Sequence, residues 1–181
     1  MRGMVAATGA TSGERWREAH LQALRLAQRL REISRVFRRY AGELKYHPQT
    51  GLQGHVGQDL LDAAAALRDV LEAVAGLSAR WDEELAWLRQ RGPQAPVEEV
   101  QREHAEAREA ARLTRAALEV FEQAVTRPET ASLDAPYGAG APRRVHPGAQ
   151  CTWVAQRAEQ LATTLSAVTL HKENLLLARA V

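Results

Sequence analysis

The sequence predicts an all-α protein: an antiparallel up-down-up-down four-helix bundle with long helices and a long loop between helices 3 and 4. Three observations support this fold class. Apolar residues recur at alternating three- and four-residue spacings, which gather them on one helix face. The 181 residues are rich in Ala, Leu, Arg and Glu and poor in aromatic residues, a composition that favours helices over strands. Clusters of Gly and Pro divide the chain into four periodic segments.

The first helix is expected over about residues 12–46. Residues 1–11 are small and polar, and we expect them to form a disordered N-terminal tail before a single helical-bundle domain at 12–181. The sequence T-S-G-E from Thr11 is a capping-box pattern that begins the helix, and His47-Pro48 ends it. Its apolar positions repeat every seven residues, at Trp16, Ala23, Leu30, Phe37 and Leu44.

The second helix is expected over about residues 58–91, between a glycine-rich turn and Gly92-Pro93. Asp59 or a neighbour caps it. Its seven-residue series comprises Leu60, Leu67, Val74, Trp81 and Leu88. Because a tight turn joins it to the next helix, we expect it to be the central strut of the bundle. Further apolar residues lie off this series, and they form either a second buried face or an exposed interface: Leu61, Val70, Leu77 and Trp87.

The third and fourth helices are expected over about 96–127 and 152–179. Pro96, followed by Val97 and two glutamates, is a strong helix start. The intervening loop, 128–150, contains several Pro and Gly residues and has no periodicity. Loops of this length are uncommon in compact domains and are usually functional or disordered. A runner-up to the bundle is a pair of extended hairpins, each needing a partner chain to cover its second apolar line.

Charge, cysteine content and the lack of long apolar segments indicate where the protein is located. The net charge is +2, but residues 13–45 carry nine basic and four acidic residues, whereas the next two helical segments are acidic. Cys151 is the only cysteine, so no internal disulfide can form. The opening residues lack the apolar run of a secretory signal, and no segment approaches about 18 uncharged apolar residues. We therefore expect a soluble, cytoplasmic protein without a membrane partner.

Up-down topology would bring three histidines to one end of the bundle, near Trp81 and Trp87. Imidazole is a ligand for Zn, Cu, Fe and Ni, so these histidines are candidates for a metal or haem site. The Glu-x-x-His pairs of ferritin-like di-metal bundles and the His-Glu-x-x-His motif are both absent. The favoured interpretation is therefore a core edge with no bound metal or cofactor. The three candidates are His20, His104 and His171.

The opposite end of the bundle would receive both long connections, which carry basic and aromatic residues. Such mixtures contact phosphate groups or single-stranded nucleic acid. Carboxylates nearby make a solvated loop surface the favoured interpretation. The candidates for anion binding are Arg38, Arg39, Lys45, Arg143 and Arg144.

No catalytic residue is assigned. The stretch GLQGHVGQ lacks the Lys-Ser/Thr of a phosphate-binding loop and follows no predicted strand. Cys151 would lie at a helix N-terminus, where the helix dipole lowers a thiol pKa and gives some reactivity. A structural or incidental cysteine is the favoured interpretation.

The sequence therefore favours a non-enzymatic helical protein–protein interaction module. It would act as an adaptor, complex subunit or chaperone-like factor that docks a partner or a second copy through apolar helix faces. One alternative is nucleic-acid or phosphorylated-ligand binding at the basic end, and another is a bundle that binds a metal or haem through the three histidines. The expected partner-binding residues are Trp87, Leu170, Leu176 and Leu177.

Overall fold

The computed structural model describes residues 12–47, 51–53, 56–90, 97–126, 132–133, 143–144 and 147–177, with side chains at 17–44, 56–90, 97–126 and 148–168. The fold is all-α, as the sequence predicts. Its four helices are α1 (Ser12–Glu43), α2 (Gln58–Gln90), α3 (Val97–Thr126) and α4 (Pro147–Leu177). Two short antiparallel ladders lie between them: β1 (Lys45–His47) with β2 (Gly51–Gln53), and β3 (Ser132–Leu133) with β4 (Arg143–Arg144).

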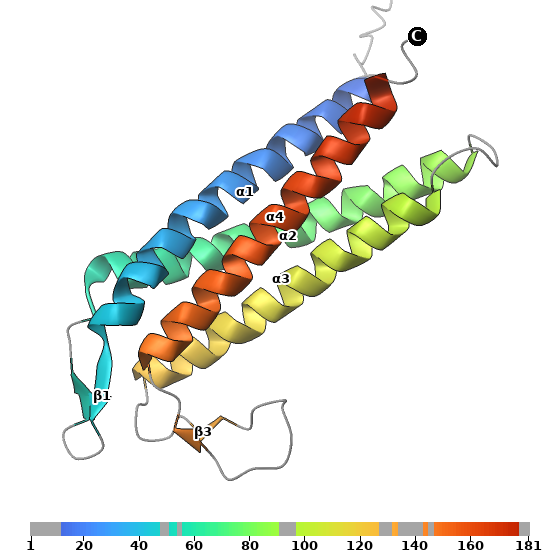
Figure 1. Cartoon of the computed structure of the whole chain (residues 1–181). Coiled ribbons are helices and arrows are strands. Elements are labelled where there is room, and N and C mark those ends of the chain that lie inside the picture. The colour runs from blue at the N-terminus through green and yellow to red at the C-terminus, as the bar shows by residue number, and fades with distance from the viewer. Residues whose placement is uncertain are drawn as a thin grey trace, which may run out of the picture.

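The contacts between the helices fit a bundle. α1 and α4 share the most extensive contact, followed by α3 with α4, α1 with α2, and α2 with α3. In Figure 1 the start of α1 and the end of α4 lie at one end of the molecule, and both strand ladders lie at the other. The end of α2 and the start of α3 stand apart from the α1–α4 pair (Figure 1). The four helices are therefore packed most fully toward the ladder end.

The core follows the predicted seven-residue series. Leu30 and Phe37 of α1 and Leu60 and Leu67 of α2 are completely buried. Phe37 meets Phe121 of α3 edge to face, with ring centroids 5.1 Å apart and planes at 78°. This geometry suits the quadrupoles of two aromatic rings. The pair ties α1 to α3 across the centre of the bundle.

Of the four helices, α4 has the most extensive contacts and α2 the least, so the expectation that the second helix would be the central strut is wrong. The inward face of α4 combines large and small residues: Leu161 and Leu165 are completely buried, as are Ala155, Ala158 and Ala162. Small side chains let neighbouring helices approach closely enough for polar groups to reach the backbone. The Ser34 hydroxyl of α1 donates a hydrogen bond to the carbonyl oxygen of Ala155 at 3.0 Å. The Thr114 hydroxyl of α3 donates one to the carbonyl oxygen of Arg157 at 3.1 Å.

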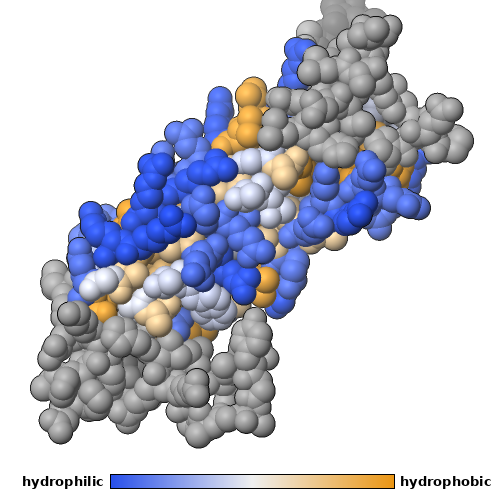
Figure 2. All heavy atoms as spheres, viewed as in Figure 1, coloured by the Kyte–Doolittle hydropathy of each residue, from blue (hydrophilic) through white to orange (hydrophobic). Residues whose placement is uncertain are grey.

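The outward surface of α4 is weakly polar. Figure 2 shows a pale strip of intermediate hydropathy along the middle of the molecule, where α4 lies in Figure 1, between hydrophilic flanks. Exposed residues of α4 in this stretch include Thr152 and Thr163, whose hydroxyls donate to the carbonyl oxygens four residues earlier, at 3.1 and 3.0 Å. These hydroxyls are therefore already engaged with the backbone of their own helix.

Two helix boundaries differ from the sequence prediction by three residues or more. α1 ends at Glu43 rather than near 46, because Lys45–His47 pairs with Gly51–Gln53 and its backbone groups are used in that ladder. α4 begins at Pro147 rather than near 152, since proline is well accommodated in the first helical turn. The expected tail at 1–11 and most of the expected loop at 128–150 lie outside the described residues.

A helix needs about 20 predominantly apolar residues to cross a membrane. None of the described helices has a stretch long and apolar enough to do so.

Candidate functional site

The surface between α2 and α3 is bridged by ion pairs. Arg108 contacts Asp82 at 2.6 Å, and Arg115 contacts Glu72 at 2.8 Å. The side chains in both pairs are at least 40% exposed, so solvent screens them and each contributes only a few tenths of a kcal/mol. α2 and α3 are thus held on this side mainly by long polar side chains, in keeping with their limited direct contact.

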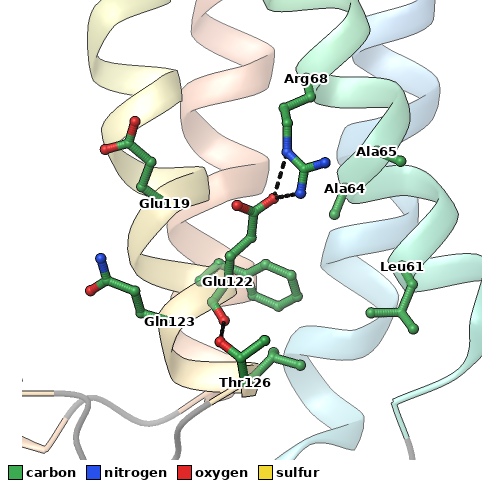
Figure 3. A pocket seen from close by; sticks show the side chains of 10 residues that line it. Leu61, Ala64, Ala65, Arg68, Glu119, Glu122, Gln123 and Thr126 are labelled. Carbon is green, nitrogen blue, oxygen red and sulfur yellow. Dashed lines mark hydrogen bonds and ion pairs between the residues drawn. The ribbon is translucent and has the colours of Figure 1, made fainter.

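A groove of about 530 Å³ opens between the start of α2 and the end of α3 (Figure 3). We call it the α2–α3 groove. Its apolar lining includes Leu61, Ala64 and Ala65 of α2 and Phe121 and Val125 of α3. Phe121 is buried, whereas Leu61 is 42% exposed. An apolar wall with one exposed leucine can accept an apolar side chain from outside the molecule.

One ion pair spans the groove. Arg68 of α2 reaches Glu122 of α3, with its Nε 3.1 Å from the Glu122 carboxylate and its Nη2 also in contact (Figure 3). Glu119 and Gln123 line the groove but point away from Arg68 (Figure 3). The carboxylate of Glu119 has no ion-pair partner in the described part of the chain. Among the described residues, the groove therefore has an apolar wall, a rim bridged by the Arg68–Glu122 pair, and the carboxylate of Glu119 without an ion-pair partner.

The junction of α1 and α2 is fastened by a polar cluster around Asp59. Its carboxylate accepts hydrogen bonds from the Tyr40 hydroxyl, from Arg39 and, at 3.1 Å, from the backbone N–H of Leu60. The Tyr40 hydrogen bond, together with Arg39, holds the pKa of Asp59 below its usual value. The same hydrogen bond to Asp59, together with burial, raises the pKa of Tyr40, and Arg39 opposes this rise. Gly57 leaves room for this cluster, because a Cβ there would lie 2.6 Å from Asp59 Oδ1 and still closer to the Tyr40 hydroxyl.

The candidates for anion binding are only partly described. Arg39 pairs with Asp59, and Arg38 lies 3.8 Å from Glu159 of α4. Lys45 belongs to β1, and Arg143 and Arg144 form β4, but their side chains are outside the described ones. Of the five candidates, the two with described side chains therefore already face carboxylates.

The predicted histidine end contains a buried aromatic stack. His104 of α3 is completely buried, and its ring lies 4.8 Å from that of Trp81 of α2, with the planes 9° apart. Its Nε2 lies 3.7 Å from a carboxylate oxygen of Glu84. His20 of α1 is also buried, whereas His171 lies in α4 with its side chain outside the described ones. Within the described residues, no group of three or more His, Cys, Asp or Glu is arranged to hold a metal ion.

Cys151 is not at an activated position. It lies in the second turn of α4 and is completely buried. Burial raises the pKa of its thiol to about 12. The expectation that a helix N-terminus lowers this pKa is therefore wrong, because the cost of placing a thiolate among apolar side chains outweighs the helix dipole.

Of the expected partner-binding residues, only Trp87 has a described side chain. Trp87 is half-buried and packs with Leu85, Leu88 and Val100 in a small cluster where α2 ends and α3 begins. Leu170, Leu176 and Leu177 lie in α4, but their side chains are outside the described ones.

The described side chains include three large hydrophobic residues that are exposed. Leu61, Val70 and Leu77 of α2 were expected to lie off its main seven-residue series. Leu61 is exposed, whereas Val70 and Leu77 are buried. Leu21 and Leu24 of α1, which are 54% and 38% exposed, were not among the residues predicted to lie at the surface. The sequence does indicate that these two leucines are exposed, because both fall outside the predicted seven-residue series of that helix.

Comparison with known proteins gives no relative. No family model, curated protein or solved structure matches this chain.

Proposed function

We propose that this protein is a non-enzymatic helical interaction module, an adaptor, complex subunit or chaperone-like factor, that docks a partner or a second copy through apolar helix surface. The observation that carries the proposal is the α2–α3 groove. Exposed Leu61, two alanines of α2 and buried Phe121 all line it, so an apolar side chain of a partner meets apolar atoms from both helices. Recognition of an amphipathic helix by an apolar groove uses the same elements.

The limited contact between α2 and α3 supports this function. Where helices pack closely, their side chains fill the seam and leave no space for a partner. Here, ion pairs such as Arg68–Glu122 join the two helices while leaving apolar atoms beside them uncovered. A partner gains apolar burial of roughly 25 cal/mol for each Å² that it removes from water. The groove is thus a surface at which association lowers the free energy.

We also propose that the four helices have an antiparallel up-down-up-down topology, with a long loop over 128–150. Two cross-helix pairs support opposite directions for α2 and α3: Glu72 meets Arg115, and Asp82, later in α2, meets Arg108, earlier in α3. We also infer a cytoplasmic location, which is supported by the single cysteine because one cysteine allows no internal disulfide.

Site-specific photo-crosslinking tests the groove as a docking site. A photoreactive amino acid replaces Ala65, which lines the groove, in the full chain expressed in its native source. The expected result is a discrete crosslinked species that disappears when Leu61→Asp is added. The matched control places the same amino acid at Ala79, an exposed position of α2 that does not line the groove.

Two outcomes contradict the proposal. One is the absence of a crosslinked species from position 65, and the other is the same set of species from positions 65 and 79. Leu61→Asp is informative because the side chain is already 42% exposed, so the substitution leaves the core intact. A circular dichroism melting curve that matches the wild type verifies this.

A further inference from the structure

We propose that the α2–α3 groove receives the first half of α1 from a second copy of the same chain. This rests on the proposed function and names the partner. The docking segment is the α1 edge, which we define as Arg17, Leu21, Leu24 and Arg25. Leu21, Leu24 and Arg25 follow Arg17 by four, seven and eight residues, which is the spacing of one side of a helix. All four are exposed.

The apolar parts of the two surfaces match. Leu21 and Leu24 stand on the α1 edge, and Leu61 stands in the groove. Together these are the large hydrophobic residues that are exposed among the described side chains. Docking two leucines one helical turn apart into an apolar groove is how amphipathic helices are commonly bound. Contact between the two surfaces removes from water the apolar side chains that the bundle itself leaves uncovered.

The charges of the two surfaces are also complementary. Arg17 and Arg25 flank the leucines and have no ion-pair partner in the described part of the chain, unlike Arg31 and Arg38, which lie near Glu159. The groove holds one arginine and two glutamates, and Arg68 is already paired with Glu122. Glu119 thus offers a negative charge to an incoming arginine. Such complementarity orients the docking helix and disfavours like-charged surfaces.

The positions of the two surfaces decide the kind of assembly. The α1 edge lies near the start of α1, whereas the groove is formed by the start of α2 and the end of α3, at the ladder end of the molecule (Figure 1). One chain therefore cannot place its own edge in its own groove. When two copies meet through one such contact, the remaining edge and groove either engage each other in a closed two-fold dimer or bind further copies in a ring or an open chain of subunits.

Sedimentation of the purified full chain tests this assembly. Because two leucines and a few charges form a small contact, the expected result is a monomer of 20.0 kDa at low micromolar concentration and a mass that rises steadily toward millimolar concentration. High salt is expected to reduce the rise, since the arginine contacts are exposed. The variants Leu21→Glu/Leu24→Glu and Leu61→Glu should each remain monomeric over the whole range.

Mixing the two variants distinguishes an edge-to-groove contact from an edge-to-edge or a groove-to-groove one. The Leu21→Glu/Leu24→Glu chain keeps an intact groove, and the Leu61→Glu chain keeps an intact α1 edge. Their mixture should form a dimer and stop there, because only one competent contact remains. The matched control is Ala79→Glu, an exposed position of α2 that does not line the groove, which should associate like the wild type.

A charge exchange tests the orientation. Glu119→Arg alone and Arg17→Glu/Arg25→Glu alone should each weaken association at least tenfold, and the chain that carries all three substitutions should recover most of it. Self-docking is overturned by a wild type that stays monomeric at every concentration, by a mixture that fails to dimerise, or by variants that associate like the wild type. If a monomeric wild type still gives a specific crosslink from Ala65 to a different protein, only self-docking fails. If that crosslink is absent too, both proposals fail.

Discussion

The indole of Trp81 on α2 lies flat against the imidazole of His104 on α3, with 4.8 Å between ring centroids. Both side chains are buried, and the Glu84 carboxylate approaches the imidazole from one side at 3.7 Å. This stack joins α2 to α3.

Removing the imidazole should destabilise the bundle. His104→Ala leaves a cavity against Trp81 and eliminates the stacking, and we expect a loss of about 2–4 kcal/mol in the free energy of unfolding. Urea unfolding followed by circular dichroism measures it. Arg102→Ala, an exposed position on the same helix, serves as the control and should change stability by less than about 0.5 kcal/mol. Equal stabilities for His104→Ala and the wild type would show that the stack contributes nothing.

Two glycines should respond in opposite directions to the same substitution. Gly57→Ala forces a Cβ into the Tyr40–Asp59 cluster, so we expect destabilisation of about 1–3 kcal/mol. Gly76 lies within α2, where a Cβ would meet nothing within 4 Å, so Gly76→Ala should stabilise the protein by about 0.5–1 kcal/mol. Thermal and urea unfolding of both variants provide the comparison. A stabilising Gly57→Ala would mean that Tyr40 moves away without loss.

The Asp59 cluster should make stability depend on pH in acid. The pKa of Asp59 is lower in the folded protein than in the unfolded chain, chiefly through the Tyr40 hydrogen bond and also through Arg39. The contribution of the carboxylate is therefore fully present above the unfolded pKa of about 3.9 and is lost as pH falls through the folded pKa. We expect the stability difference between wild type and Asp59→Asn to hold from neutral pH to about pH 5 and to shrink below about pH 4.

A double-variant comparison isolates this effect. In a Tyr40→Phe background the main hydrogen bond to Asp59 is absent, so Asp59→Asn should produce a smaller pH-dependent difference. Unfolding free energies across the acid range, measured in urea at constant ionic strength, give both curves. A difference that stays constant down to the lowest pH would exclude Asp59 as the titrating group.

The Cys151 thiol should be unreactive in the native protein. Burial raises its pKa to about 12, so the thiolate that attacks a disulfide reagent is scarce and also shielded. With a chromogenic aromatic disulfide at about pH 8, we expect reaction far slower than for the same chain unfolded in guanidinium chloride. The unfolded chain is the internal control for thiol content. A native rate equal to that of a small free thiol would require an accessible Cys151.

Periodicity predicts which face of a helix is buried, and here it did so well. Phe37, Leu67 and Trp81 belong to the expected series and are buried. Periodicity does not say which helix covers a face. The second face of α2 is covered at Val70 and Leu77 but not at Leu61, because its neighbours cover only part of its length. The groove therefore could not be placed from the sequence.

The extent of the contacts that α4 makes could not be predicted from the sequence. Its buried face combines large residues such as Leu161 and Leu165 with alanines that carry little hydrophobic signal. Small residues such as Ala155 act by letting backbones approach, as the hydrogen bond from Ser34 shows. The start of α4 was missed for a related reason, since Pro147 and Gly148 are turn residues in most contexts. The packing of α4 against its neighbours, which the sequence does not show, places these two residues in a helix.

The pairing of α1 with α4 has a consequence for the order in which the chain folds. The hydrogen bond from Ser34 to Ala155 joins residues 121 positions apart, whereas Arg108 and Asp82, which join α2 to α3, are only 26 apart. Closing a longer loop loses more chain entropy and slows folding. We therefore expect α2 and α3 to associate early and α1 to meet α4 late, so this helical protein should fold more slowly than bundles whose contacts are mostly local.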